Sequence, residues 1–214
     1  MRKLTLLIFI GFLPSFSAAQ IAHAKWKIGV NPLGLAEPQA TLGFSAEYRL
    51  IPRIGIWGEA SYIFNNSYLN RSWKQVKGYR VVLQTRYYIL SRNSLFITPE
   101  IRFKNFSYRS TGNFLNTASG DTLFNLPFKA TQQLIGGAFV VGKQWYLSKN
   151  KNFSLEFTAG IGAKKRNINR RNIPEGYQYN SDKYSFGLSP HTETDKEGAP
   201  YFPIGLRLIW QIKN

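Results

Sequence analysis

The side chains that most resemble catalytic machinery lie close together near the end of the chain. His191 follows Ser189 and precedes Glu193 and Asp195, so a nucleophile, a base and acids share one short segment. Hydrolases with such a set need it held in a fixed geometry. One polar segment supplies no such geometry, and the sequence therefore predicts no catalytic residues and no enzyme activity.

The same segment places polar side chains at alternate positions, namely His191, Glu193, Asp195 and Glu197. Calcium prefers oxygen ligands, but its familiar loops carry a glycine that is missing here. A solvated acidic loop is the competing interpretation. The chain has no cysteine, which excludes disulfides and thiolate metal sites. Whether this segment binds a cation stays open, and we assign no metal ligand and no cofactor.

A larger set of charged side chains occurs within apolar segments, at every second position. Period two places such residues on one face of a β-strand. Opposite charges on neighbouring strands neutralise one another by cross-strand pairing. The sequence thus predicts one network of acids and bases: Glu47, Glu59, Glu100 and Glu156 with Arg49, Arg80, Arg86, Arg102, Lys104 and Arg207.

The elements that must position these charges are long β-strands. Helical periodicity is absent, whereas polar and apolar residues alternate and aromatic residues make up 15% of the chain. Most of the expected strands exceed the usual ~5–6 residues, and a tilted strand that crosses a membrane needs ~9–11. The segment 131–147 is apolar on both faces, so its phase is not readable. The eight expected strands are residues 26–33, 41–50, 53–65, 76–90, 95–109, 131–147, 153–167 and 201–212.

The links between these strands alternate in length. Three links are tight and polar, and the other four are longer and grow along the chain. Short turns at one end and long loops at the other, with an even strand count, are typical of outer-membrane barrels. The short links lie at Pro52, 91–94 and 148–152, and the long links at 34–40, 66–75, 110–130 and 168–200.

Alternation alone does not say which face points outward, and a soluble sandwich or lipocalin-like barrel with an apolar interior is the alternative. A lysine or arginine at the membrane midplane costs ~2–4 kcal/mol. The charged face must therefore point inward if the strands span a membrane. An eight-stranded ring is just wide enough for side chains, which predicts a packed polar interior rather than a pore. Amphipathic rings near strand ends favour the membrane orientation: Tyr48, Tyr62, Phe64, Tyr79, Tyr87 and Trp210.

The first residues have the pattern of an export signal. Arg2 and Lys3 precede a largely apolar run, and Ser17-Ala18-Ala19 provides small residues for cleavage before Gln20. The run is shorter than the ~20 residues of a spanning helix. We predict a signal peptide over residues 1–19 and one barrel domain over residues 20–214.

The charge of the chain is strongly positive. The formal net charge is +17, and without Arg2 and Lys3 it is +15. Such a balance attracts polyanions, and after export lipopolysaccharide is a better candidate than nucleic acid. A generic basic rim is the alternative for the candidate lipopolysaccharide contacts at the base of the fourth long link: Lys164, Lys165, Arg166, Arg170 and Arg171.

Four segments together carry a resemblance to a known family. They are KWKIGVNPLGL (25–35), ATLGFSAEYRL (40–50), LFITPEIRFKNFSY (95–108) and FPIGLRLIW (202–210). Together they resemble a family of small outer-membrane β-barrel proteins of unknown function, related in architecture to the OmpX and OmpA barrel domains. The resemblance implies no catalytic residue. One departure is the end of the chain, Ile212-Lys213-Asn214, where barrels of this kind often end on an aromatic residue.

These observations predict an all-β, eight-stranded antiparallel up-and-down barrel in the cell outer membrane. We expect it to be a monomer without enzymatic activity, structural or surface-binding through its third and fourth long links. Its expected partners are outer-membrane lipid, lipopolysaccharide and an extracellular ligand or protein, and not nucleic acid. A lipid-modifying enzyme or a narrow channel is the alternative. Phe114, Phe124, Phe128, Tyr177, Tyr179 and Tyr184 are aromatic anchors on the two links.

Overall fold

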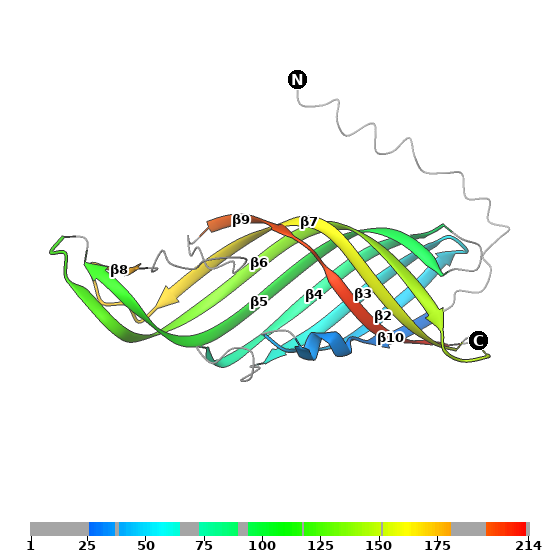
Figure 1. Cartoon of the computed structure of the whole chain (residues 1–214), viewed down its shortest axis with the longest axis horizontal. Coiled ribbons are helices and arrows are strands. Elements are labelled where there is room, and N and C mark those ends of the chain that lie inside the picture. The colour runs from blue at the N-terminus through cyan, green and yellow to red at the C-terminus, as the bar shows by residue number, and fades with distance from the viewer. Residues whose placement is uncertain are drawn as a thin grey trace, which may run out of the picture.

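The computed structural model describes residues 26–36, 39–64, 73–89, 94–116, 118–150, 152–180 and 196–212. The predicted signal peptide lies outside these residues. Within them the chain forms ten β-strands and one short 3-10 helix, η2 (Figure 1). Their bounds are β1 Trp26–Val30, η2 Pro32–Ala36, β2 Thr41–Ile51, β3 Ile54–Phe64, β4 Lys74–Tyr88, β5 Leu95–Asn116, β6 Thr122–Tyr146, β7 Phe153–Arg171, β8 Tyr177–Asn180, β9 Lys196–Tyr201 and β10 Ile204–Gln211.

Eight of the strands close into an antiparallel, barrel-like ring. Consecutive strands pair from β1 to β7, and β10 closes the ring by pairing with both β7 and β1. Strand β9 continues the line of β10 beyond a break at Phe202 and Pro203, and it pairs with the outer part of β7. Within the described residues, the prediction of an all-β fold with a ring of eight antiparallel strands is confirmed, and β8 and β9 are additional strands outside that ring. None of the helices among the described residues is long and apolar enough to cross a membrane.

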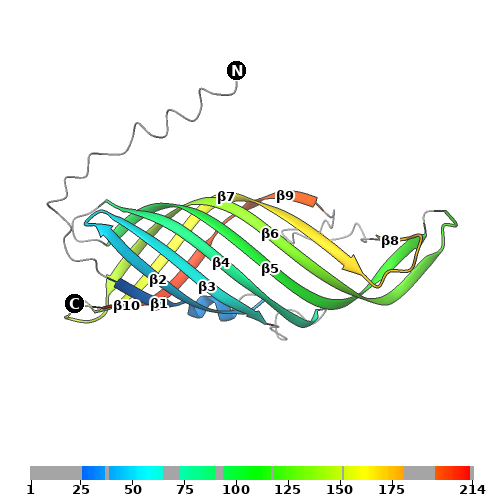
Figure 2. The same cartoon turned by 180° about the vertical axis from the view of Figure 1, so that it is seen from behind.

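The two ends of the ring differ, as Figures 1 and 2 show. Strands β2, β4 and β6 end, and strands β3, β5 and β7 begin, at one end, called here the inner end. At the opposite, outer end, the β5–β6 hairpin extends well beyond the ring. The prediction of loops over 110–130 and 168–200 is wrong in part, because β5, β6, β7, β8 and β9 all reach into these ranges.

The error has a physical cause. The range 110–130 is rich in Ser, Thr, Gly and Asn and contains Pro127, a composition typical of loops. The two arms nevertheless pair with one another as far as Leu115 and Thr122, and β8 adds a strand beside the end of β5. Their ladder satisfies the backbone while Phe114 and Phe128 are buried between them.

The first strand is shorter than predicted. Strand β1 ends at Val30, and Pro32 begins η2. Proline fixes φ and has no N–H, so it cannot donate to a central ladder. A side chain at Gly34 would meet the hydroxyl of Thr41, and this close approach lets η2 pack on β2 above the end of β1.

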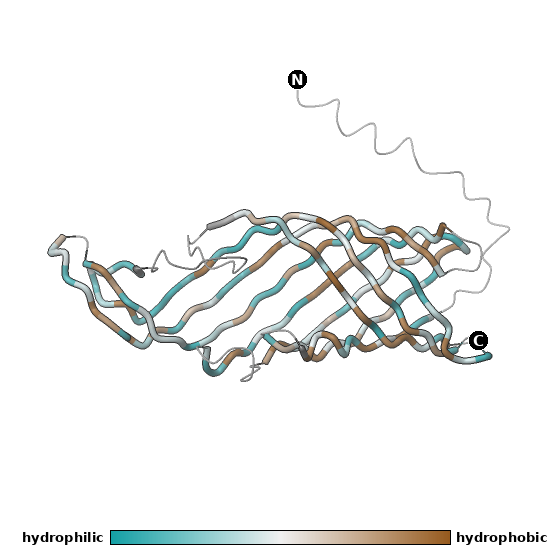
Figure 3. The backbone as a smooth tube through the Cα atoms, viewed as in Figure 1, coloured by the Kyte–Doolittle hydropathy of each residue, from teal (hydrophilic) through white to brown (hydrophobic). Residues whose placement is uncertain are grey.

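Exposure alternates along the strands of the ring. Phe139 and Phe44 on the outer face are 75% and 66% exposed, whereas Trp57 on the inner face is 1% exposed. Strand β6, whose phase the sequence does not reveal, turns Phe139 outward and Gln144 inward. The hydrophobic stretches gather around β1 and β10 (Figure 3). The ring thus has an apolar exterior in its inner half and a polar interior.

An aromatic cluster closes the outer part of the interior. Trp73 stacks on Tyr108 with ring centroids 4.2 Å apart. Farther out, the rings of Phe114, Phe128 and Tyr179 meet edge to face at 5.5 to 5.6 Å. This hydrophobic core ties the protruding hairpin and β8 to the ring.

Candidate functional site

The centre of the interior is an alternating chain of acids and bases. The guanidinium of Arg86 on β4 donates two hydrogen bonds to the carboxylate of Glu156 on β7, at 2.8 and 2.9 Å. The same guanidinium donates to Glu47 Oε2 at 3.0 Å. Two strands that are not neighbours in the ring, β4 and β7, are therefore joined across the interior.

A second arginine extends the chain. Arg207 Nη1 donates to Glu156 Oε1 at 3.0 Å, and Arg207 Nε donates to Glu59 Oε2 at 3.2 Å. Glu59 in turn accepts from Arg80 Nη2 at 2.7 Å. The resulting order is Glu47, Arg86, Glu156, Arg207, Glu59 and Arg80, in which every neighbour carries the opposite sign.

One aromatic side chain contacts both central arginines. The Arg86 and Arg207 guanidinium carbons lie 4.8 and 4.3 Å from the ring of Trp57. Aromatic faces attract cations more strongly where water is excluded, and these three side chains are almost fully buried. Trp57 therefore helps to fix both guanidinium groups.

Pairing partners at the periphery come from residues that sequence reasoning missed. Lys27 Nζ lies 3.7 Å from Glu47 Oε2 and donates to Gln144 Oε1 at 2.9 Å. Gln144 Nε2 donates to Glu156 Oε2, and the Tyr88 hydroxyl donates to Glu47 at 2.6 Å. Lys27 was not recognised because its strand is too short to show a clear alternation. Gln144 was not recognised because the inward face of β6 could not be identified from the sequence. Tyr88 could have been predicted to face the interior, because it lies two positions after Arg86 on the same strand.

The other predicted interior charges occupy the two ends of the network. Arg49 Nε lies 3.2 Å from Glu47 Oε1 at the inner end. Arg102 Nη2 lies 3.0 Å from Glu100 Oε1, and the Arg102 side chain is 21% exposed. Lys104 lies farther out, where its ammonium donates to Gln39 Oε1 at 2.9 Å. All ten predicted residues thus face the interior, and six of them form the central alternating chain.

The five candidate lipopolysaccharide contacts do not share a face. They lie within β7 rather than at the base of a loop, so period two divides them. Lys165 and Arg171 are exposed on the outer face. Lys164 lies over the ring of Tyr201, 5.7 Å from its centroid, and Arg170 lies 4.4 Å from the centroid of Tyr179. Arg166 has the same strand parity as these two. Three of the five therefore do not lie on the exterior.

The segment considered for catalysis lies outside the described residues. This applies to Ser189, His191, Glu193 and Asp195, as well as to the side chain of Glu197. Within the described part of the chain, no group of three or more His, Cys, Asp or Glu side chains is placed to hold a metal ion.

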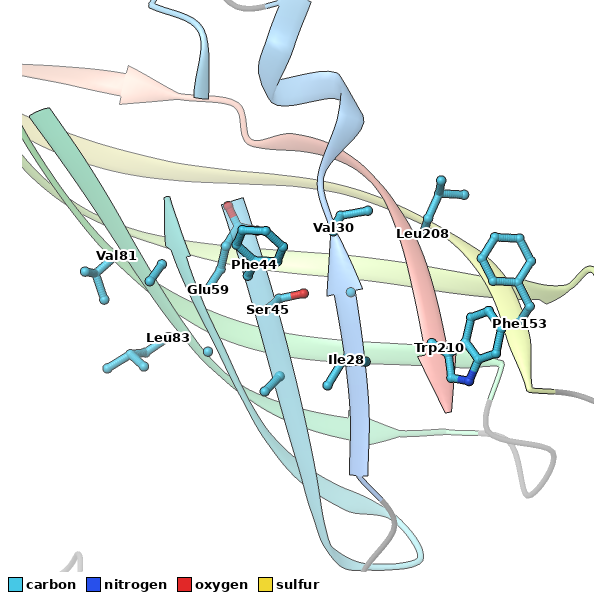
Figure 4. A pocket seen from close by; sticks show the side chains of 14 residues that line it. Ile28, Val30, Phe44, Ser45, Glu59, Val81, Leu83, Phe153, Leu208 and Trp210 are labelled. Atoms are coloured by element: carbon cyan, nitrogen blue, oxygen red, sulfur yellow. The ribbon is translucent and has the colours of Figure 1, made fainter. Parts of the chain in front are cut away.

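The exterior carries an apolar hollow of about 800 Å³ over β1 to β4 and β10, with Phe153 of β7 at its edge (Figure 4). Small residues belong to its lining, among them Ala46, Gly58 and Ala60. At one end the rings of Phe153 and Trp210 lie 5.9 Å apart. The hollow continues the apolar exterior and supplies no catalytic set.

Comparison of the chain with protein-family models, curated proteins and solved structures finds no match. The resemblance to small outer-membrane barrels therefore stays a prediction from the sequence.

Proposed function

We propose that the mature chain is an integral β-barrel of a Gram-negative outer membrane, exported by a cleaved signal peptide and without enzymatic activity. One observation carries the proposal: the ring is apolar outside and ionic inside. Exposed aliphatic and aromatic side chains cover its outer face on every strand, and buried acids and bases fill its centre.

This distribution is the reverse of that in a water-soluble barrel. Soluble monomers rarely expose contiguous apolar patches beyond a few hundred Å². Here Leu83, Ile101, Phe139 and Ile161 belong to consecutive strands and are 54% to 75% exposed. Hydrocarbon is the solvent in which such a surface is stable, and a closed ring leaves no unpaired edge within it.

Aromatic side chains at two levels support the same orientation. At the inner end, the rings of Trp26 and Tyr48 lie 4.8 Å apart, with Trp210 close to the same end. Toward the outer end, Tyr62 and Tyr79 face one another across β3 and β4 and are half-exposed. Two such levels are what the water–membrane interfaces of a barrel select.

A plugged interior favours a structural or surface-binding role over conduction. The side chains of Arg86 and Glu156 have zero exposure, which supports a closed interior at this level of the ring. We expect no stepwise ion conductance in planar bilayers. A reproducible unitary current would favour the alternative of a narrow channel.

The binding surface that we propose is the protruding end. The β5–β6 hairpin and β8 are held by the aromatic cluster, and Phe124 near the tip is 71% exposed. A rigid base with exposed aromatic groups is a good anchor for a ligand or protein. The lipid-modifying alternative predicts altered lipid A mass spectra in cells that express the protein, and their loss in a His191→Ala variant.

Two measurements test the proposal. The purified mature chain should require detergent or lipid to stay folded and monomeric, and stable folding in plain buffer would overturn it. Protease added to intact cells should cut between β5 and β6 and between β8 and β9, and it should spare the short links. Cuts at the short links would contradict the orientation.

A further inference from the structure

Four basic residues lie side by side across four strands of the outer face. Lys74 on β4 pairs with Arg109 on β5, Arg109 pairs with Lys129 on β6, and Lys129 pairs with Arg171 on β7. All four side chains are exposed. Directly paired residues of an antiparallel sheet project from the same face, so the four form one row, called here the cation row.

A β-bulge brings the first member into this row. The register shifts between Lys74 and Lys77, and Gln75 has a φ of 53°. Val76 faces the interior and Lys77 faces the exterior. Lys74 lies two positions before Val76, so uninterrupted alternation would turn Lys74 toward the interior as well. The extra residue of the bulge places Lys74 opposite the outward Arg109 instead. Bulges that redirect a side chain in this way are common beside functional sites.

The row is electrostatically unfavourable by itself. Adjacent strands lie ~4.7–4.9 Å apart, and like charges directly opposite one another destabilise a sheet. None of the four side chains makes an ion pair or a hydrogen bond with any of the described residues. An arrangement that repels itself becomes favourable when an anion binds along it.

Along the strands toward the outer end, the exterior changes from aromatic to polar and then to charged side chains. Tyr62, Tyr79 and Asn105 are paired across three strands and form one line of residues. Lys77 and Ser107 form the next line toward the outer end of the ring. Beyond them comes the cation row. A hollow of about 350 Å³ beside it is lined by the cations Lys77, Arg109 and Lys129 and by the hydroxyl-bearing Ser107. The sequence of tyrosine, hydroxyl and cation suits the transition from acyl chains to phosphorylated headgroups.

We propose that the cation row and its hollow bind the phosphate groups of a lipopolysaccharide headgroup. This inference rests on the proposed membrane orientation. Phosphate oxygens accept charge-assisted hydrogen bonds from arginine and lysine. A headgroup with several phosphates can meet several cations of the row at once, whereas a phospholipid with one phosphate meets fewer. Arg171 is shared with the five contacts expected from the sequence, and the other three members of the row come from the pairing of the strands.

The test uses the refolded mature chain in detergent micelles and measures binding of lipopolysaccharide by titration. The row variant is R109S/K129S/R171S. The matched control is R53S/K143S/K149S, which removes the same charge from exposed residues near the inner end. We expect about tenfold weaker binding for the row variant and less than about twofold for the control, because several charge-assisted contacts are lost together.

Three probes identify the ligand chemistry. Dephosphorylated lipopolysaccharide, phosphatidylglycerol and a single-stranded oligonucleotide should each bind more weakly than intact lipopolysaccharide, and added NaCl should weaken the intact complex. Equal loss in the row and control variants, or tighter binding of the oligonucleotide, would overturn the proposal. A variant that keeps its detergent-dependent fold but binds normally refutes the cation row alone. Folding without detergent refutes the membrane orientation instead.

Discussion

Replacing Arg86 by methionine removes the cation at the centre of the interior. Its guanidinium satisfies both oxygens of Glu156 and one oxygen of Glu47. Methionine fills part of the same volume without charge. The two carboxylates then share the remaining cations, Arg207 for Glu156 and Lys27 and Arg49 for Glu47.

The magnitude follows from the burial of the carboxylate that is left behind. Removing one partner of a buried ion pair costs about 3–5 kcal/mol when it leaves an uncompensated charge where water is absent. Because Glu156 keeps its pair with Arg207, we expect a loss at the lower end of this range. The Glu156 side chain has zero exposure, so little solvent screening reduces this cost. Against a typical stability of ~5–15 kcal/mol, Arg86→Met should remove a large fraction of the free energy of unfolding.

The assay is urea unfolding of the protein in lipid vesicles, followed by tryptophan fluorescence, since Trp57 contacts the Arg86 guanidinium. Arg109→Met is the matched control, because Arg109 is exposed on the outer face and its loss should change stability by no more than about 0.5 kcal/mol. The double variant Arg86→Met/Glu156→Gln should be less destabilised than the single one, since it leaves no unpaired charge between these two strands. A single variant no less stable than the control, or a double variant worse than the single, would refute the reasoning.

Three further outcomes follow from the same structure. Phe139→Arg should cost about 2–4 kcal/mol in vesicles, and an unchanged unfolding midpoint there would favour the soluble orientation. Gly142→Val should destabilise the ring by about 1–3 kcal/mol in the same assay, because a side chain there meets the ring of Phe96, whereas Gly198→Ala meets nothing and should be neutral. Phe114→Ala should loosen the outer aromatic cluster, so limited proteolysis of the β5–β6 turn should accelerate while the ring remains protected.

Part of the fold could be predicted because the alternation of polar and apolar residues depends only on neighbours along one strand. Alternation along single strands identified eight strands and separated the outward Phe157 from the inward Glu156. It could not assign β6, where apolar residues occupy both faces. Nor did it recognise the outer parts of β5 and β6 as strands, since their polar composition is that of a loop and only their mutual pairing orders them.

A residue's strand parity depends only on its neighbours in the chain, so the charged face could be predicted before any strand was paired. Which acid meets which base depends on how the strands close into the ring. Glu156 and Arg207 are direct neighbours in the β7–β10 ladder, but Arg86 reaches Glu156 across the interior, 70 positions away in the chain. Ring closure sets that distance, and no local pattern encodes it. The cation row is likewise a product of register, because a one-residue bulge at Gln75 decides whether Lys74 joins it.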